Sequence, residues 1–295
     1  MTDVSSNFIT DDSIAISVTG LSKTYQVWDR PMSRFLYSLC RRTGHFLTHQ
    51  LGTEHDLSRY FARRALRGFR EVQALNRVSF QIGKGEVVGV VGYNGSGKST
   101  LLSVLARVYK ITSGTVTLSG RDGGKARMAT LLELGAGFHS DLTGIENIEF
   151  YGAVMGLHGK EIRSKIKAIV EFSELGEQKV GDPLRGWSDG QKLRLGFAIA
   201  IHTNPDILLV DEVLAVGDEA FQAKCYQYIA GFQKRGGTIL FVTHDLPVVE
   251  RVANRVIWMS RGVIEQDGDP PSVLHAYRDA SASWISPLDT IEFGR

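Results

Sequence analysis

The residues best placed to do chemistry form one glycine-rich stretch, GYNGSGKST at residues 92–100. It fits the pattern G-x-x-x-x-G-K-[ST], in which glycines let the backbone wrap closely around a polyphosphate. Successive backbone N–H groups can point at the anion, the lysine can reach the β- and γ-phosphates, and the Ser99 hydroxyl can ligate Mg²⁺. The residues that we expect to bind nucleotide phosphates are Gly92, Asn94, Gly95, Ser96, Gly97, Lys98, Ser99 and Thr100.

Two more sets of polar side chains follow apolar stretches later in the chain. Asp211 and Glu212 come directly after ILLV at 207–210, and His244 comes after TILFVT at 238–243. The first carboxylate can hold Mg²⁺, and the second can orient or deprotonate an attacking water. A lone histidine after a strand is usually a polar loop residue, but here it can contact the γ-phosphate. The order and spacing of the three groups favour Asp211 as a metal ligand, with Glu212 and His244 as catalytic residues.

A parallel sheet would bring these groups together. The run EVVGVV at 86–91 predicts a short buried strand, and LLSVLA at 101–106 predicts a helix. Strand, loop and helix is the order that the phosphate-binding motif requires. Ligands of open α/β sheets bind at the carboxyl ends of the strands, where the loop, the carboxylates and the histidine all stand.

The composition is that of a soluble globular protein with one large domain or two small ones. The 295 residues are 43% hydrophobic and 22% charged, and a net charge of +2 gives no general case for nucleic-acid binding. Two cysteines, Cys40 and Cys225, cannot form a disulfide framework and suit a reducing compartment. The sequence has no long apolar run and no signal-peptide pattern at its polar start. We expect a cytoplasmic protein that meets a membrane only through a partner or a surface contact.

The first part of the chain contains an arginine-rich segment. Residues 14–27 alternate in places and predict an edge strand. Tyr25 within it could stack on an adenine base, although a strand aromatic considered alone more often packs in the core. Residues 28–70 hold nine arginines with interleaved aromatics and leucines, which predicts one or two basic amphipathic helices. The sequence leaves two roles open for them: contact with an anionic membrane or partner, and a solvated face.

The second half alternates helices and strands. Residues 146–187 predict polar helices, WSDGQ at 187–191 interrupts them, and an apolar helix follows. Residues 256–259 and 262–265 predict a terminal hairpin, and 273–280 predict a last helix.

Together these stretches resemble an ATP-binding cassette ATPase, the nucleotide-binding subunit of an ABC transporter. The resemblance covers roughly residues 14–280 apart from the arginine-rich insertion. Besides the phosphate loop and His244, it rests on WSDGQ at the signature position, on 207–212 as Walker B, and on AVGD at 215–218 as the D-loop.

The resemblance implies an α/β fold with a mixed sheet core, an antiparallel β subdomain and a helical subdomain. The chain, residues 1–295, would be a single nucleotide-binding domain. Its parts would be a basic insertion at 28–70, a helical subdomain with the signature loop at 146–203, and a short tail at 281–295 without a carbohydrate-binding domain.

The family also implies a head-to-tail dimer, most simply a homodimer, with each ATP between the phosphate loop of one subunit and the signature loop of the other. Ser188 and the N–H of Gly190, at a helix N-terminus, would face the γ-phosphate across the interface. The resemblance adds Gln191 and Asp218 to the nucleotide-binding residues, and Tyr25 fits the family's adenine-stacking position. The implied cofactors are ATP and Mg²⁺.

Two positions depart from the family's usual pattern. Asp189 stands where the family usually has glycine, and an extra carboxylate near a triphosphate is tolerable only if its side chain points away. The glutamine expected after residues 113–120 is missing, and LLELGAGFH at 131–139 stands there instead. Glu133 is a candidate replacement and metal ligand, but it is one residue out of register, so the sequence leaves this substitution open.

A narrower resemblance points to one subfamily. Residues 132–139, 142–147 and 213–218, together with the insertion, resemble ATPases that export polysaccharides such as O-antigens, teichoic acids and capsules. The resemblance implies ATP hydrolysis that powers export of a lipid-linked polysaccharide through a separate integral-membrane permease, with the glycan handled only indirectly. It places the subunit peripherally on the cytoplasmic face of the inner (plasma) membrane, with no nucleic-acid partner.

The alternatives fit the sequence less well. A soluble ABC ATPase acting on DNA or ribosomes usually has a long coiled-coil insertion or two cassettes in one chain, and this sequence has neither. A P-loop kinase or GTPase would lack the signature loop, and an ABC importer would normally keep the glutamine and lack the insertion. The exporter interpretation is favoured, with the soluble ABC ATPase as the alternative.

Overall fold

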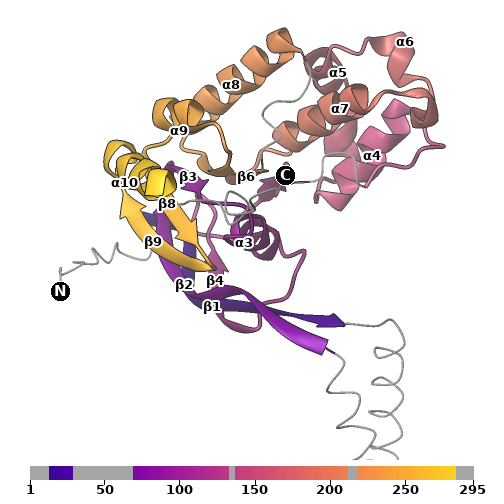
Figure 1. The fold of residues 1–295 in the computed structure, drawn as a ribbon. Helices are drawn as coiled ribbons and strands as arrows, with labels where there is room; N and C mark the ends of the chain where they lie inside the picture. The colour runs from indigo at the N-terminus through magenta and orange to yellow at the C-terminus, as the bar shows by residue number, and fades with distance from the viewer. Residues whose placement is uncertain (1–12, 29–68, 133–136, 212–217, 284–295) are drawn as a thin grey trace, which may run out of the picture.

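The computed structural model describes residues 13–28, 69–132, 137–211 and 218–283. Its centre is a six-stranded sheet with the strand order β5-β6-β7-β3-β8-β9 (Figure 1). Neighbouring strands run parallel except for β8 and β9, so the sheet is mixed. Its strands are β3 (Val87–Val91), β5 (Met128–Thr130), β6 (Ile207–Asp211), β7 (Thr238–Val242), β8 (Arg255–Ser260) and β9 (Val263–Gly268).

Both faces of the central sheet are buried, which explains why its strands are continuous apolar runs. In β3, Val87 and Val91 pack in one core cluster, whereas Val88 and Val90 pack in the other. The first cluster also contains residues of four helices, and the second is closed by α3 (Lys98–Leu105) and strands β1 and β2. The four helices are α7 (Asp189–His202), α8 (Glu219–Lys234), α9 (Leu246–Val252) and α10 (Pro270–Ser283).

A second, three-stranded antiparallel sheet has the order β2-β1-β4. Its strands are β1 (Ile14–Trp28), β2 (Phe69–Gly83) and β4 (Ser113–Leu118). The mixed sheet, this antiparallel sheet and the helices confirm the α/β fold class that the sequence implies. The prediction that residues 14–27 form an edge strand was wrong, because β1 is the middle strand. Alternation reports that one face of a strand is buried, but not how many strands lie beside it.

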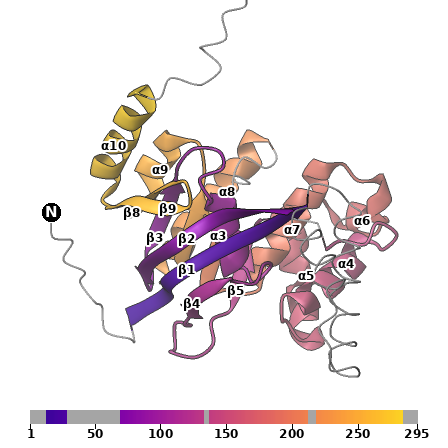
Figure 2. The ribbon, with the colours of Figure 1, turned by 60° about the horizontal axis from the view of Figure 1, so that its bottom comes forward.

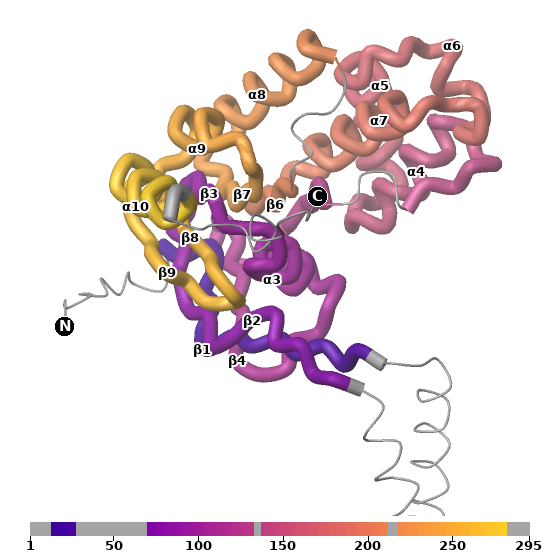
Figure 3. Tube along the Cα trace, in the orientation of Figure 1, coloured from indigo at the N-terminus to yellow at the C-terminus, as the bar shows by residue number. Residues whose placement is uncertain are grey.

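Strand β1 pairs with its two neighbours over different lengths. Strand β1 pairs with β4 only as far as Ser22, opposite Ser113, whereas its pairing with β2 continues to Trp28, opposite Phe69. The outer halves of β1 and β2 therefore form a two-stranded ribbon that extends away from α8 and α9 (Figure 1, Figure 3). Figure 2 shows the inner parts of both strands passing across α3. The arginine-rich segment joins the two strands and lies outside the described residues, apart from its ends.

Four helices and a short 3₁₀ turn pack around a separate core that includes Ile148, Ile169 and Trp187. They are α4 (Gly144–Val154), α5 (Gly159–Ser173), α6 (Glu177–Val180), η2 (Leu184–Gly186) and one side of α7, which contributes Leu195, Ala198 and Ile199. The side chain of fully buried Asn147 bonds to both backbone groups of His139, which fixes the loop before α4. Among the described residues, no helix combines the length and the apolar character needed to cross a bilayer.

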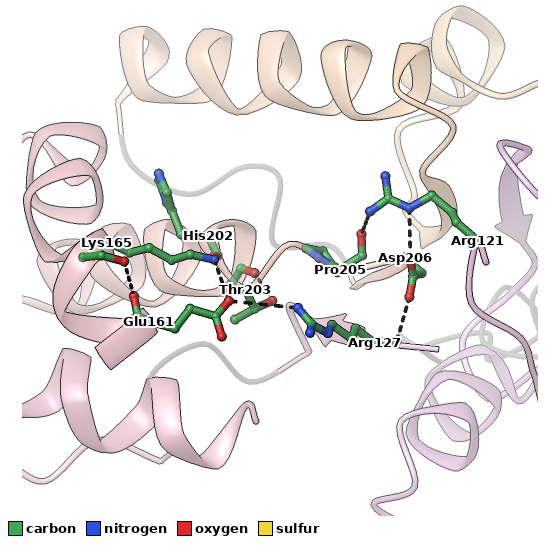
Figure 4. A network of polar contacts seen from close by, with 10 residues as sticks. Arg121, Arg127, Glu161, Lys165, His202, Thr203, Pro205 and Asp206 are labelled. Carbon is green, nitrogen blue, oxygen red and sulfur yellow. Dashed lines mark hydrogen bonds and ion pairs between the residues drawn. The ribbon is translucent and has the colours of Figure 1, made fainter. Parts of the chain in front are cut away.

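A chain of polar contacts joins the helical part to the central sheet (Figure 4). On the sheet side, the Arg121 guanidinium donates to Asp206 Oδ1 at 2.9 Å and to the Pro205 carbonyl at 2.9 Å. The other oxygen of Asp206 accepts from the backbone N–H of Arg127 at 2.9 Å. These bonds fix the segment that enters β6, the strand that ends at Asp211.

On the helical side, Lys165 of α5 lies 3.2 Å from Glu161 and donates to the carbonyl of His202 at 2.7 Å. It thereby satisfies a carbonyl at the end of α7, where a cation is favourable. The Arg127 guanidinium lies 4.0 Å from Glu161 and connects the two sides.

Nδ1–H of His202 donates to the Ala198 carbonyl at 2.6 Å. Burial lowers the pKa of this imidazole and the Lys165 charge lowers it further, although the Ala198 carbonyl opposes both effects.

This environment makes a pH-dependent contribution to stability. The folded imidazole resists protonation, so below its ordinary pKa near 6.5 the unfolded chain binds a proton that the folded chain does not. The His202 contribution to the free energy of unfolding is therefore present above pH 6.5 and lost as the pH falls below it. We expect urea denaturation between pH 7 and 5 to show a shallower loss of stability for His202→Gln than for the unaltered chain. Parallel profiles for His202→Gln and the unaltered chain would refute the role of His202.

Candidate functional site

The glycine-rich loop connects the end of β3 to the start of α3. Its last glycine, Gly97, is the residue before the helix and has a left-handed backbone conformation, with φ 105° and ψ 0°. Glycine has no side chain, so the residue before α3 does not cap the N-terminus of this helix. The first N–H groups of the helix and the positive end of its dipole are thus available to an anion, as the sequence predicts for this loop.

Two glycines of the loop have no room for a side chain. A Cβ atom on Gly92 would lie 2.2 Å from the carbonyl oxygen of Met259, and one on Gly97 would lie 2.6 Å from that of Ala74. The loop is therefore held between strand β2 and the β8–β9 hairpin. The turn of that hairpin also bonds to it, because the N–H of Gly262 donates to the Ser96 carbonyl at 2.9 Å.

The side chain of Lys98 is only 6% exposed, and its ammonium group is held by the loop itself. Nζ donates to the carbonyl oxygens of Gly92 at 2.7 Å and Tyr93 at 2.9 Å. An ammonium group beside the first N–H groups of a helix can also donate to phosphate oxygens, so the residues present fit a nucleotide phosphate chain.

Other residues of the loop are also suited to a nucleotide phosphate chain and its metal ion. The Ser96 hydroxyl is buried and has no hydrogen-bond partner among the described residues, whereas the Ser99 side chain in the first helical turn is exposed. An exposed hydroxyl at that position can join the coordination of Mg²⁺. Asn94 and Gly95 are exposed, and Thr100 is half-buried.

The outer side of the loop contacts the C-terminal helix. The Tyr93 hydroxyl donates to Ser281 Oγ at 2.8 Å, and its ring centroid lies 5.4 Å from that of Tyr277. Tyr277 in turn packs against Trp258 of β8 with a centroid distance of 5.8 Å. A cavity of about 410 Å³ lies between the loop, the hairpin and α10. The Trp258 indole N–H is buried and has no hydrogen-bond partner within the described part of the chain.

The predicted catalytic groups stand at the same edge of the sheet as the loop. Asp211 ends β6 directly opposite Val242 of β7, and β7 also pairs in parallel with β3. His244 follows Val242 by two residues and is exposed. The structure thus brings Asp211, His244 and the loop to one edge of the sheet. Glu212 and Glu133 lie outside the described residues.

The segment at the signature position starts α7 with reciprocal capping. The Ser188 hydroxyl accepts from the N–H of Gln191 at 3.3 Å, and the Gln191 amide oxygen accepts from the N–H of Ser188 at 3.0 Å. Gly190 lies in the first turn, where its N–H is free of the helix ladder. The Asp189 side chain is 95% exposed and lies 3.5 Å from Lys192. The extra carboxylate is therefore partly neutralised on the outer surface of the helix.

Asp218 uses both carboxylate oxygens within its own chain. Oδ1 accepts from the N–H of Phe221 and caps α8, and Oδ2 accepts from Arg194 of α7 at 2.6 Å. The pKa of this carboxyl is lowered mainly by the Phe221 N–H and further by Arg194. The sequence analysis did not identify Arg194 as a functional residue, although an arginine in an otherwise apolar helix was a usable signal.

Tyr25 lies on β1 opposite Val72 and is not part of the described core clusters. Its ring packs edge-to-face against Tyr109, with the centroids 5.7 Å apart. The sequence analysis did not identify Tyr109. Within the described residues, no group of three or more histidine, cysteine or acidic side chains could hold a metal ion by itself.

The glycine contacts lead to a matched pair of substitutions. Gly92→Ala places a Cβ atom against the Met259 carbonyl, so we expect it to destabilise the fold by roughly 3 kcal/mol and to abolish nucleotide binding. Gly95 also has a left-handed conformation, with φ 78°, but no atom of the described residues lies within 4 Å of its Cβ position. Gly95→Ala should therefore cost only about 1 kcal/mol. Denaturant unfolding and calorimetric titration with MgADP measure both effects, and equal destabilisation by the two substitutions would contradict the steric explanation.

Comparison with known sequences identifies close relatives. A family profile described as ABC transporter matches residues 75–215. The chain is 47% identical to the O-antigen export system ATP-binding protein RfbB of Klebsiella pneumoniae, over 72% of this chain and 84% of that protein. It is 40% identical to the teichoic acids export ATP-binding protein TagH of Listeria innocua, over 72% of this chain and 61% of that protein.

Solved structures agree on the fold. The chain is similar to the ATP-binding cassette MJ0796 in a dimeric post-hydrolysis state bound to ADP and Pi, with a TM-score of 0.62 and 22% identity. That match covers 86% of this chain and 98% of the other. A structure described as the ATP-binding subunit of an ABC transporter matches 90% of this chain and 93% of its own, with a TM-score of 0.65 and 18% identity.

Proposed function

Because the chain belongs to the ABC transporter family of ATP-binding proteins, we propose that it is the ATP-hydrolysing subunit of a polysaccharide exporter. Its cargo class is a lipid-linked glycan of the O-antigen, teichoic acid or capsule type, which crosses the membrane through a separate permease. The similarity to the O-antigen and teichoic acid export proteins supports this class. The observation that carries the ATPase role is the loop with a buried lysine and an uncapped helix, at the sheet edge that also carries Asp211 and His244.

In this proposal, the phosphate chain of ATP lies on the N-terminus of α3. Lys98 shares its protons between the loop carbonyls and the phosphate oxygens, and the adjacent N–H groups hold the β-phosphate. Ser99 and Asp211 would hold Mg²⁺, with Glu133 as a further candidate ligand. When bound, the metal neutralises charge that develops on the phosphate oxygens.

Glu212 and His244 have the catalytic roles in this proposal. Glu212 follows Asp211 in the chain, so it is placed to orient or deprotonate the attacking water. His244 follows β7, the neighbour of both β6 and β3, so its ring can reach the γ-phosphate end of the nucleotide. Tyr25 provides the aromatic surface for the adenine.

A single cassette needs a second copy to complete the site. We propose a head-to-tail homodimer in which Ser188 and the N–H of Gly190 meet the γ-phosphate held by the other copy. The first turn of α7 supports this arrangement, because its N–H groups and positive dipole end suit an anion. The exposed position of the Asp189 carboxylate reduces its repulsion of a triphosphate. Gln191 acts in this site by shaping the turn, and Asp218 by capping α8.

The permease contact belongs to the helical part of the chain. Helix α4 exposes Ile145, Phe150 and Val154, and the loop before it is fixed by Asn147. An apolar surface of this kind suits a partner protein. We propose that the permease docks here and that the subunit lies peripherally on the cytoplasmic face of the inner membrane.

The Glu212→Gln variant tests the proposed function in two steps. It should lose ATP turnover by at least 100-fold while forming an MgATP-dependent dimer, because only the step that activates water is impaired. Phosphate release and size-exclusion chromatography with light scattering measure the two effects. Glu219→Gln, an equivalent change at an exposed residue in the first turn of α8, should keep both turnover and dimerisation. Near-normal hydrolysis by Glu212→Gln would refute the assignment.

The trapped dimer then serves as bait for the exporter. With MgATP in mild detergent, we expect it to retain a multi-spanning membrane protein encoded beside glycan-synthesis enzymes. Mass spectrometry of the retained proteins gives the answer. Recovery of ribosomes or nucleic acid instead would replace the exporter with a soluble ABC ATPase.

A further inference from the structure

Large apolar side chains that are open to solvent gather in two places within the described residues. One group lies on α4, the surface proposed above for the permease. The other, which we call the outer patch, lies on β1, β2 and the turn after α3, and consists of Val27, Val72, Val108, Tyr109 and Ile111. Tyr109 is 46% exposed and Val108 is 64% exposed. Apolar surface gathered beside a ligand-binding loop is typical of a site that a ligand covers.

Tyr109 is fixed against Tyr25 at one side of this patch. The two rings meet at an interplanar angle of 87° with their centroids 5.7 Å apart, an edge-to-face geometry that aromatic pairs favour. The Lys23 ammonium lies 4.8 Å from the centroid of Tyr25 and 5.7 Å from that of Tyr109. The cation therefore interacts with both rings.

Hydrogen bonds hold the turn after α3 onto β1, so the ring pair is not a chance contact between mobile side chains. Lys23 Nζ donates to the Lys110 carbonyl at 2.9 Å. The N–H of Thr112 donates to the Ser22 carbonyl at 2.9 Å, and the Thr112 hydroxyl accepts from the N–H of Thr24 at 3.0 Å. These bonds fix the position of Tyr109 relative to the strand that carries Tyr25.

Two paths through the fold connect the ring pair to the phosphate loop. Leu75 of β2 lies beside Gly97, since its Cδ2 atom would be 3.0 Å from a Cβ on that glycine, and Leu75 pairs with Lys23. Tyr25 is two residues further along β1, about 7 Å at the usual rise of a strand. On the other path, Tyr109 follows the C-terminus of α3, whose N-terminus forms the loop. A nucleotide with its phosphates on α3 can therefore extend its base toward both rings.

We propose that Tyr109 is a second aromatic residue of the base-binding site, where it orients the Tyr25 ring and gives the purine base a second apolar contact. The inference rests on the proposed nucleotide site and adds a specificity element to it. The base explains why Tyr109, Val72 and Tyr25 stand beside one another without being packed in the core. Tyr109 thus acts on the base directly and through Tyr25, and its removal affects the part of the affinity that comes from the base, not the part that comes from the phosphates.

Calorimetric titration with MgADP and with magnesium pyrophosphate separates these two parts, because only ADP carries a base and neither ligand is hydrolysed. We expect Tyr109→Ala to weaken MgADP binding about five- to tenfold, the lower end of the scale of one base–aromatic contact. Pyrophosphate binding should stay within about twofold. Tyr109→Phe keeps the ring and should restore MgADP binding. In steady state, the KM for ATP should rise for Tyr109→Ala while kcat stays close to its original value.

Tyr226→Ala is a matched control, since this tyrosine is also partly exposed and has a cation over its ring, with Arg251 5.6 Å from the centroid, but it lies on α8. It should leave both affinities unchanged. Unchanged MgADP binding by Tyr109→Ala, or equal weakening of MgADP and pyrophosphate, would overturn the inference. Lys98→Ala tests the underlying site separately: if it bound both ligands like the unaltered chain, the proposed nucleotide site would fail, whatever Tyr109 does.

Discussion

The backbone between β3 and α3 passes so close to two other segments that residues 92 and 97 have no space for a Cβ atom. One of these segments is β2, about 20 residues earlier in the chain, and the other is the β8–β9 hairpin, more than 160 residues later. The shape of the loop is therefore a property of the assembled fold and not of its local sequence. Glycines are required at residues 92 and 97 because the loop lies between two backbones, and a Cβ atom at either position would meet one of them. The two sheets, the β8–β9 hairpin and α3 together determine the conformation of the phosphate loop, residues 92–100.

The charged groups around the loop also bear on how it binds a phosphate chain. The fold buries the ammonium of Lys98, and at the start of α3 it places Gly97, which has no side chain to cap the helix. Asp218 is bonded to Arg194 and to the start of α8, and Asp189 lies beside Lys192 on the surface. The Lys98 ammonium and the N-terminus of α3 thus lie where a phosphate chain would lie, and the two carboxylates Asp218 and Asp189 have cationic neighbours elsewhere.

Much of this could be predicted from the sequence, for reasons that particular residues make clear. The loop, the buried strands and the terminal hairpin depend on local patterns, and a strand buried on both faces, such as residues 207–211, has an unmistakable composition. The capping role of Ser188 also follows from its place before a helix, with Gln191 three residues later. The position of β1 could not be predicted, because strand neighbours are set by contacts distant in sequence. The contacts of Asp218 with Arg194 and of Tyr25 with Tyr109 could not be predicted for the same reason. Each joins residues 24 or more positions apart, and no local pattern encodes such a pairing.

The bond from Tyr93 to Ser281 joins residues 188 positions apart and bears on how the protein is made. During translation, β3 and the loop leave the ribosome long before α10 does, and domains fold as their segments become available. The central strands and α3 can then assemble around a phosphate loop whose outer side is still open. Because α10 is the last of the described helices, its contact with Tyr93 forms after the central strands have been synthesised, and only then is the loop enclosed on both sides. The order of the chain thus delays enclosure of the loop until the described elements that precede α10 have been made.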